Sequence, residues 1–430
     1  MYQGNFLTVL RKRRDFRLLW LGQIIARLGD NFYWLALLIT VNEMTGSTLA
    51  MGFTTISLAL PQLLLGLPAG VLVDRFDRRK VMIASDLLRS GLILFCLLVD
   101  GPEQVWIFYV VGFLLSAIGV FFIPARQAVT PLLVGEEDLL SANALLETSR
   151  TLALLLGAAA AGFAIGYAGA KTGFILVSIS FLLSAFFLWR MRVPQTIETG
   201  RSTSVSVLWR ELRQGLGFLR RSRLLTTTMI VMTVVMLGIG AINVLWVPFM
   251  DRLFGVGPEG LGIADSLQGA GMLVGSIVVG NLTSRFRLTR LLSGSLALLG
   301  LSVVAVGMAP AFVAVLIILV FLGMTLPPLN AAASTLVQMV TPDELMGRVN
   351  SASGTVQSVA NIVSMALAAT LGDIIGVRTV FVICGAIMLL AAVLGWVTLR
   401  EPDQEPASSA AVATAAVHLA ADKQGERWDE

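Results

Sequence analysis

Long apolar runs recur along this 430-residue chain, and they constrain its fold more than any other feature. The runs are roughly 18–25 residues long, enough for a helix to cross a hydrocarbon layer of about 30 Å. The chain is 56% hydrophobic and 13% charged, whereas a soluble domain carries about 25% charged residues. So little polar surface cannot coat a water-soluble body, and we expect an all-α membrane protein.

The runs predict twelve transmembrane helices, six on either side of a polar break. Their expected bounds are 18–42, 50–73, 81–99, 105–123, 144–166, 172–190, 225–249, 260–282, 290–308, 311–333, 350–370 and 377–398. The chain is accordingly expected to comprise an N-terminal six-helix half (1–190), a cytoplasmic linker (191–224), a C-terminal six-helix half (225–398) and a disordered cytoplasmic tail (399–430).

Lysine and arginine are sorted by loop. If the N-terminus lies inside, 25 of the 31 fall in cytoplasmic segments, three lie in or near spans, and three (Lys171, Arg252 and Arg378) fall on the opposite side. Cytoplasmic loops of membrane proteins carry such an excess. The sequence therefore predicts a multi-pass protein of the bacterial inner membrane with both termini in the cytoplasm. The net charge of +4 does not indicate a nucleic-acid-binding surface, because the positive residues are sorted by loop and not gathered in one patch.

The two halves resemble each other where each fourth span passes into the fifth. P-A-R-Q-A-V-T-P-L-L-V-G-E-E-D-L-L-S-A-N-A begins at Pro124, and P-L-N-A-A-A-S-T-L-V-Q-M-V-T-P-D-E-L-M-G-R-V-N-S-A begins at Pro328. The separation is close to half the chain. Two parallel six-helix repeats indicate a transporter architecture.

A short charged loop joins the second and third spans. This stretch, Gly70–Lys80, reads G-V-L-V-D-R-F-D-R-R-K. It resembles the signature loop G-x-x-x-D-R-x-G-R-R-K of the major facilitator superfamily, with Asp77 in place of the second Gly. The positions that fit are Gly70, Asp74, Arg75, Arg78, Arg79 and Lys80.

Further motifs strengthen this resemblance. They are L-G-D at 28–30, P-A-R-Q at 124–127, S-A-N-A-L at 141–145 and P-D-E-L-M-G-R-V at 342–349. Together they are similar to the drug:proton antiporter-3 branch, which includes macrolide-efflux-like proteins and the enterobactin exporter. The resemblance covers roughly residues 15 to 400.

The resemblance implies that the signature loop is a conformational lock, which holds the outward-open state and breaks when the protein faces inward. The alternative is a loop that only fixes topology, although positive-inside sorting needs neither Gly70 nor Asp74. Two i, i+3 pairs are expected to form a charge network with the loop. The lock candidates are Gly70, Asp74, Arg75, Arg78, Arg79, Lys80, Asp86, Arg89, Arg126, Glu147 and Arg150.

Carboxylates inside spans are costly and mark functional sites. Asp30 lies about twelve residues into the first span, near mid-membrane at 1.5 Å per residue, and Arg27 lies on the same helix face. Asp30 is a candidate for proton coupling or substrate binding, with Asp265 as a second candidate. The alternative is a permanent Arg27–Asp30 pair that anchors helix packing.

Polar and aromatic residues in the first and seventh spans could line a substrate cavity: Asn31, Trp34, Asn243 and Trp246. Packing against the core or lipid is the alternative. Cys96 and Cys384 lie in apolar runs and resemble core residues. The single histidine, His418, lies in the tail. We expect neither a metal site nor a cofactor.

These features predict a multidrug efflux transporter, not an enzyme. It would export hydrophobic or amphiphilic small molecules by alternating access, as a monomer in the lipid bilayer, through proton antiport. A siderophore or lysophospholipid exporter or flippase is the first alternative. A non-transporting membrane scaffold is the second, and it predicts no need for the membrane carboxylates.

Overall fold

The computed structural model describes residues 6–135, 137–193, 205–220 and 222–399. The elements are α1 (Phe6–Lys12), α2 (Arg14–Thr45), α3 (Thr48–Val73), α4 (Arg78–Ile93), η1 (Leu94–Leu98), η2 (Pro102–Gln104), α5 (Trp106–Val134), α6 (Leu139–Ala168), α7 (Ala170–Arg190), α8 (Val205–Leu219), α9 (Arg223–Phe254), α10 (Pro258–Arg285), α11 (Leu288–Met308), α12 (Phe312–Val340), α13 (Asp343–Ile374) and α14 (Val377–Thr398). The described residues contain no strand, which confirms the predicted all-α class.

Twelve described helical segments are long and apolar enough to cross a membrane, as the apolar runs predicted. They are α2 to α7 and α9 to α14, with η1 extending α4 and η2 leading into α5. Several helices continue past their expected bounds, because hydropathy marks only the hydrocarbon layer. The helix α5, for example, passes through Pro124 and Pro131 to Val134. Membrane helices tolerate such prolines because neighbouring groups satisfy the freed backbone.

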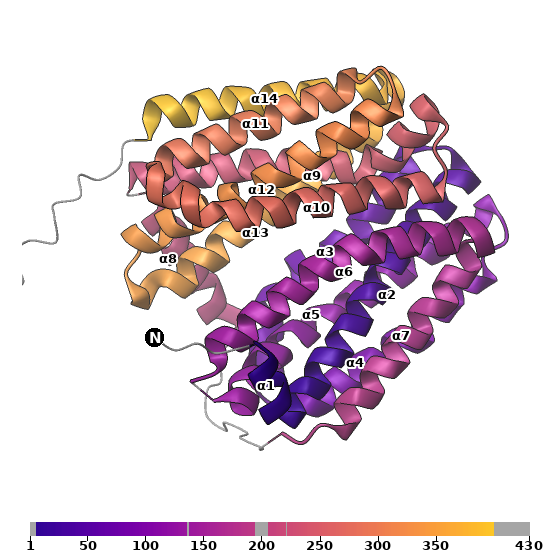
Figure 1. The fold of residues 1–430 in the computed structure, drawn as a ribbon, viewed down its shortest axis with the longest axis vertical. Coiled ribbons are helices and arrows are strands. Elements are labelled where there is room, and N and C mark those ends of the chain that lie inside the picture. The colour runs from indigo at the N-terminus through magenta and orange to yellow at the C-terminus, as the bar shows by residue number, and fades with distance from the viewer. Residues whose placement is uncertain (1–5, 136, 194–204, 221, 400–430) are drawn as a thin grey trace, which may run out of the picture.

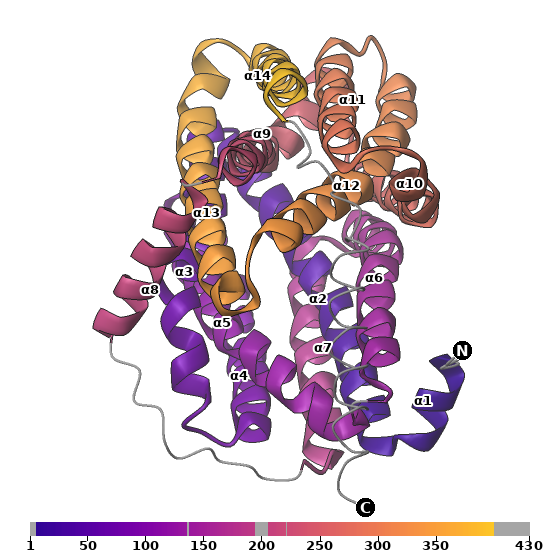
Figure 2. The ribbon, with the colours of Figure 1, turned by 90° about the vertical axis from the view of Figure 1, so that its left-hand side faces the viewer.

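The predicted linker contains a helix that hydropathy did not indicate. The helix α8 turns Leu212 and Leu219 inward and packs along α13 (Figure 2). A Cβ added at Gly215 would collide with the backbone oxygen of Arg348, so the two backbones lie close together. The predicted disordered tail lies outside the described residues, apart from Leu399.

The membrane helices form two bundles that lie side by side (Figure 1). The first bundle contains α2 to α7 and the second α9 to α14; α6 packs against α10, and α3 against α13. We call the end that carries the signature loop and the connections 286–287 and 341–342 the basic end. The other end, with the connections 46–47 and 255–257, is the far end.

Small residues bring α6 and α10 together toward the far end. A Cβ added at Gly162 would lie 2.5 Å from the backbone oxygen of Pro258, and one at Gly262 would lie 2.6 Å from that of Ala158. Only glycine permits this approach, as in other close-packed membrane helices. Gly162 of α6 and Gly262 of α10 thus form part of the contact between the halves.

Polar contacts also join the halves at the far end. Arg252 donates to the backbone oxygen of Gly46 over 2.5 Å. The backbone N–H of Thr48 donates to Asp373 over 3.2 Å, and its hydroxyl donates to the backbone oxygen of Ala369 over 2.7 Å. Asp373 also pairs with Arg252 at 3.0 Å. We call this network the far-end clasp; Asn42 adds to it by donating to Asp251 over 2.9 Å.

The described ion pairs at the basic end differ from the far-end clasp, because they join residues within the N-terminal half. Arg13, between α1 and α2, pairs with Glu137 at 2.8 Å and with Asp138 at 3.3 Å. Asp15 accepts the backbone N–H of Arg192 over 2.9 Å. Most of the described polar contacts between the halves therefore lie at the far end, and this end is closed. Ser266 of α10 adds one contact further along the bundles, by donating to the backbone oxygen of Leu155 over 2.7 Å.

Candidate functional site

The signature loop begins α4 with a capped turn. The Asp77 carboxylate accepts the backbone N–H groups of Arg79 at 3.0 Å and Lys80 at 3.2 Å. Asp is among the best residues for this position, because its side chain satisfies amides that have no partner inside the helix. The departure from the family pattern, Asp in place of Gly, therefore has a local structural role.

Of the remaining loop residues, Arg79 joins the loop to another helix of the N-terminal half. Asp74 pairs with Arg78 at 3.3 Å. Arg79 donates to the backbone oxygen of Leu188 at 3.1 Å and also to that of Trp189, which ties the loop to the end of α7. Arg75 and Lys80 are exposed. A Cβ added at Gly70 would meet nothing within 4 Å, so this conformation makes no close approach there.

Asp30 lies in a charged cluster between α2 and α4. Its carboxylate lies 3.8 Å from the Arg27 guanidinium and 4.0 Å from that of Arg89. Arg89 also pairs with the fully buried Asp86 and lies over the ring of Phe181, 4.3 Å from its centroid. Asp86 and Arg89 thus lie beside Asp30 and not beside the signature loop, contrary to the expected charge network.

A cavity of about 240 Å³ opens on this cluster, and its lining includes Arg27, Asp30, Tyr33, Gln62 and Arg89. The Asp30 side chain is 42% exposed to it. Asp30 therefore has two properties that proton exchange needs: access to water, and arginines whose pairing its protonation would change.

A largely apolar cavity of about 340 Å³ lies between the two halves. All four predicted cavity residues line it: Asn31 and Trp34 from α2, and Asn243 and Trp246 from α9. Asp265 of α10 also lines it and accepts the indole N–H of Trp246 over 2.9 Å. The other lining residues include leucines, isoleucines, valines, Phe381 and Met388. We call it the central cavity.

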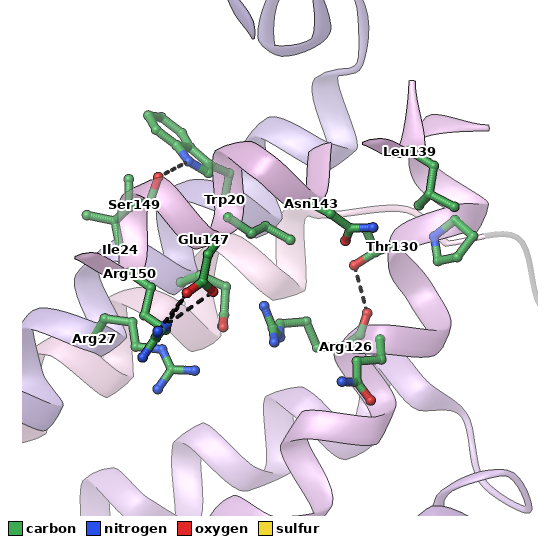
Figure 3. A pocket seen from close by; sticks show the side chains of 14 residues that line it. Trp20, Ile24, Arg27, Arg126, Thr130, Leu139, Asn143, Glu147, Ser149 and Arg150 are labelled. Carbon is green, nitrogen blue, oxygen red and sulfur yellow. Dashed lines mark hydrogen bonds and ion pairs between the residues drawn. The ribbon is translucent and has the colours of Figure 1, made fainter. Parts of the chain in front are cut away.

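A third cavity, of about 480 Å³, lies toward the basic end between α2, α5 and α6 (Figure 3). We call it the basic-end cavity. Arg150 binds Glu147 through two nitrogens, at 3.0 Å and 2.6 Å. Arg27 and Arg126 also line the cavity. Arg126, Glu147 and Arg150 thus surround a cavity rather than contact the signature loop.

Sequence reasoning did not single out Trp20, Gln23 or Gln62. A signal for the residues of α2 was present: Trp20, Gln23, Arg27 and Asn31 are spaced three or four residues apart in an otherwise apolar span, so they share one helix face. The clasp residues were missed because Asp251 and Asp373 stand at span ends, where charges are ordinary.

The described residues include no group of three or more histidine, cysteine or acidic side chains that could hold a metal ion. Cys96 and Cys384 are free cysteines, and Cys96 is buried among apolar side chains. The described linings of the three cavities contain ion pairs, amides, hydroxyl groups and apolar side chains.

Comparisons with known proteins identify relatives over most of the chain. A family model described as transmembrane secretion effector matches residues 7–426. Macrolide efflux protein A of Streptococcus pyogenes is 26% identical over 383 residues, 88% of this chain and 94% of that protein. The uncharacterized MFS-type transporter YfiS of Bacillus subtilis is 28% identical over 403 residues, 91% of this chain and 94% of that protein. A putative bacilysin exporter of Bacillus subtilis, BacE, is 30% identical over 210 residues, 49% of this chain and 52% of that protein.

Solved structures share the fold. A mutant of the nucleoside transporter NupG superposes with a TM-score of 0.75 at 12% identity, covering 89% of this chain and all of that chain (100%). A bacterial homologue of the iron transporter ferroportin, in an inward-facing state, gives a TM-score of 0.68 at 19% identity over 89% of this chain and 98% of that one. At such identities the likeness concerns the fold alone.

Proposed function

We propose, from the premise that the chain belongs to the transmembrane secretion effector family of the major facilitator superfamily, that it exports hydrophobic or amphiphilic small molecules. The observation that carries this proposal is the central cavity, which residues of both halves line. Macrolide efflux protein A and the putative bacilysin exporter support the direction of transport.

The lining of the central cavity favours substrates with a large apolar surface. Aromatic and aliphatic side chains surround a few polar groups: Asn31, Asn243, Asp265 and Gln268. Pockets of this kind bind drug-sized ligands through apolar contact, and their polar groups fix orientation. Methionine and tryptophan adapt to varied partners. We infer a site that accepts several related molecules, as in multidrug efflux.

Transport is proposed to proceed by alternating access, with the basic end in the cytoplasm. The sorting of Lys and Arg supports this orientation. The far-end clasp is closed in this structure, which corresponds to an inward-facing state. On the change to the outward-facing state the clasp opens, and the signature loop locks the basic end. Gly70, which has open space beside it here, then meets a neighbouring helix.

Proton coupling is assigned to Asp30, with Asp265 as a second candidate. Asp30 lies between two arginines and faces a cavity. Protonation of Asp30 removes a negative charge that both arginines contact, so it changes the ion pairs that join α2 to α4. Asp265 lines the substrate cavity itself and binds Trp246, so substrate and proton can compete there.

Uptake into inside-out vesicles tests this function. The protein is expressed in a drug-sensitive host, and vesicles receive a panel of apolar drugs that includes a macrolide. We expect accumulation of at least one drug when the lumen is acidic, and its collapse when an uncoupler removes the pH gradient. Absence of gradient-dependent uptake across the panel would refute proton-coupled export.

A further inference from the structure

The charged cluster inside the N-terminal half includes one arginine, Arg126, that pairs with none of the described carboxylates. Three pairs at i, i+3 spacing lie on α2, α4 and α6: Arg27–Asp30, Asp86–Arg89 and Glu147–Arg150. Arg126 of α5 is the fourth guanidinium near these pairs, and among the described residues no carboxylate lies within ion-pair distance of it. Its Nε atom is buried and has no hydrogen-bond partner there.

The unpaired guanidinium points into the basic-end cavity. Figure 3 shows Arg126 on one side and Arg27 and Arg150 on the other, with their guanidinium groups directed toward the same space. Among the described residues that line this cavity, Glu147 is the only carboxylate, and Arg150 already binds it. The described walls therefore carry more positive than negative charge, and the buried Nε of the half-buried Arg126 has no hydrogen-bond partner among the described residues.

The other lining groups suit an anion as well. Gln23, Gln127 and Asn143 add amides to the walls, and amides can donate hydrogen bonds. The planar guanidinium matches the geometry of carboxylate and phosphate oxygens and can bind two of them at once. An anion in the cavity would satisfy Arg126 and lower the repulsion between the three guanidiniums.

The basic-end cavity also leads toward the central cavity along shared helix faces. On α2, Arg27 lines the first and Asn31 the second; on α6, Arg150 lines the first and Leu154 the second. Residues four apart lie on the same face, about 6 Å apart along the axis at 1.5 Å per residue. A charged wall thus passes into an apolar wall over a single helical turn.

We propose that the basic-end cavity binds the anionic head group, a carboxylate or phosphate ester, of an amphiphile whose apolar body lies in the central cavity. This proposal rests on the proposed export function and names a substrate class for it. Arg126 supplies the charge that holds the head group, Arg27 and Arg150 lie beside it, and the apolar residues of the central cavity contact the body of the molecule.

Thermal-unfolding titrations of the purified full-length protein in a neutral maltoside detergent test the proposal. The probes are dodecyl phosphate, dodecyltrimethylammonium and inorganic phosphate. We expect dodecyl phosphate to stabilise the protein at lower concentration than either other probe. Arg126→Gln should raise its half-saturating concentration about tenfold or more, as loss of a charged hydrogen bond does, whereas Arg126→Lys should raise it less.

Arg213→Gln is the matched control, because Arg213 is exposed on α8, away from the cavity; it should titrate like the wild type. Equal response to the anionic and cationic dodecyl probes would overturn the proposal, as would an Arg126→Gln variant that binds dodecyl phosphate normally. Inorganic phosphate acting as strongly as dodecyl phosphate would overturn the role of the apolar body.

Two further measurements identify the source of the head group and distinguish this proposal from the proposed export function. Phosphatidylglycerol added to the micelles shows the source of the head group: a response that depends on Arg126 assigns it to a bilayer lipid, and no response assigns it to a single-chain amphiphile. Failure of anion binding with drug uptake retained in vesicles removes this site alone. Anion binding without uptake of any compound removes the proposed export function instead.

Discussion

Removing Arg252 should open the far end, because this residue holds the two halves together. Its guanidinium donates to the backbone oxygen of Gly46 across the interface and orients Asp373, which accepts the backbone N–H of Thr48. A charge-assisted hydrogen bond contributes about 1.5–3 kcal/mol. The Arg252 side chain is 35% exposed, and water competes for it, so we take about 1–2 kcal/mol.

That free energy is large for a two-state equilibrium. It changes the ratio of far-end-closed to far-end-open molecules by about 5- to 30-fold. Arg252→Gln should therefore increase the population in which the basic end is closed. Its matched control is Arg378→Gln, since Arg378 also lies at the far end but donates to Ala309 within the C-terminal half, over 3.1 Å.

Distance measurements between spin labels at the basic end provide the assay. Leu140 on α6 and Met339 on α12 are 83% and 50% exposed, and they belong to different halves. We expect a new short-distance population in Arg252→Gln that Arg378→Gln lacks. The reasoning would be refuted by wild-type distance distributions in Arg252→Gln, or by an equal change in both variants.

Three further substitutions probe the N-terminal half. Asp30→Asn should abolish pH-gradient-driven uptake in vesicles and leave expression and folding intact; full activity would remove Asp30 from the mechanism. Asp86→Asn leaves Arg89 without its buried partner and should cost about 3–5 kcal/mol of stability, seen as a lower melting temperature; an unchanged melting temperature would show that Arg89 is satisfied elsewhere. Asp77→Ala removes the helix cap and should cost about 1 kcal/mol, whereas Asp77→Gly should cost only a few tenths; equal losses in thermal stability would contradict the capping role.

The number of membrane helices was predictable because the hydrocarbon layer imposes one length on every span. The same rule could not find α8, since this helix does not cross the layer. It is amphipathic and depends on contact with α13 through Leu212 and Leu219. Boundaries such as the end of α5 at Val134 were missed because Pro124, Arg126 and Gln127 interrupt the apolar run, although the helix continues and buries its last residues.

Family membership was also predictable, and the match to the transmembrane secretion effector family confirms it. The signature loop and the motifs around it are local strings, so one chain suffices to recognise them. The resemblance to macrolide-efflux-like proteins likewise agrees with macrolide efflux protein A as a relative.

The arrangement of charges was only partly predictable. Spacing along one helix suggested the Arg27–Asp30 pair, which the structure places at 3.8 Å. Spacing could not show that Arg89 of α4 reaches Asp30 or that Arg126 of α5 faces Arg150 of α6, because these contacts depend on how separate helices pack. The far-end clasp depends on the same tertiary information, since it joins residues more than 200 positions apart, such as Asn42 and Asp251.

Exchange of substrate for protons is the central claim, and purified protein in proteoliposomes tests it most directly. The vesicles are loaded with a drug that passed the vesicle screen and with a trapped pH-sensitive dye, then diluted into drug-free buffer. Departure of the drug should acidify the lumen in the wild type and leave its pH unchanged in Asp30→Asn. Drug efflux without any change of luminal pH in the wild type would contradict proton antiport.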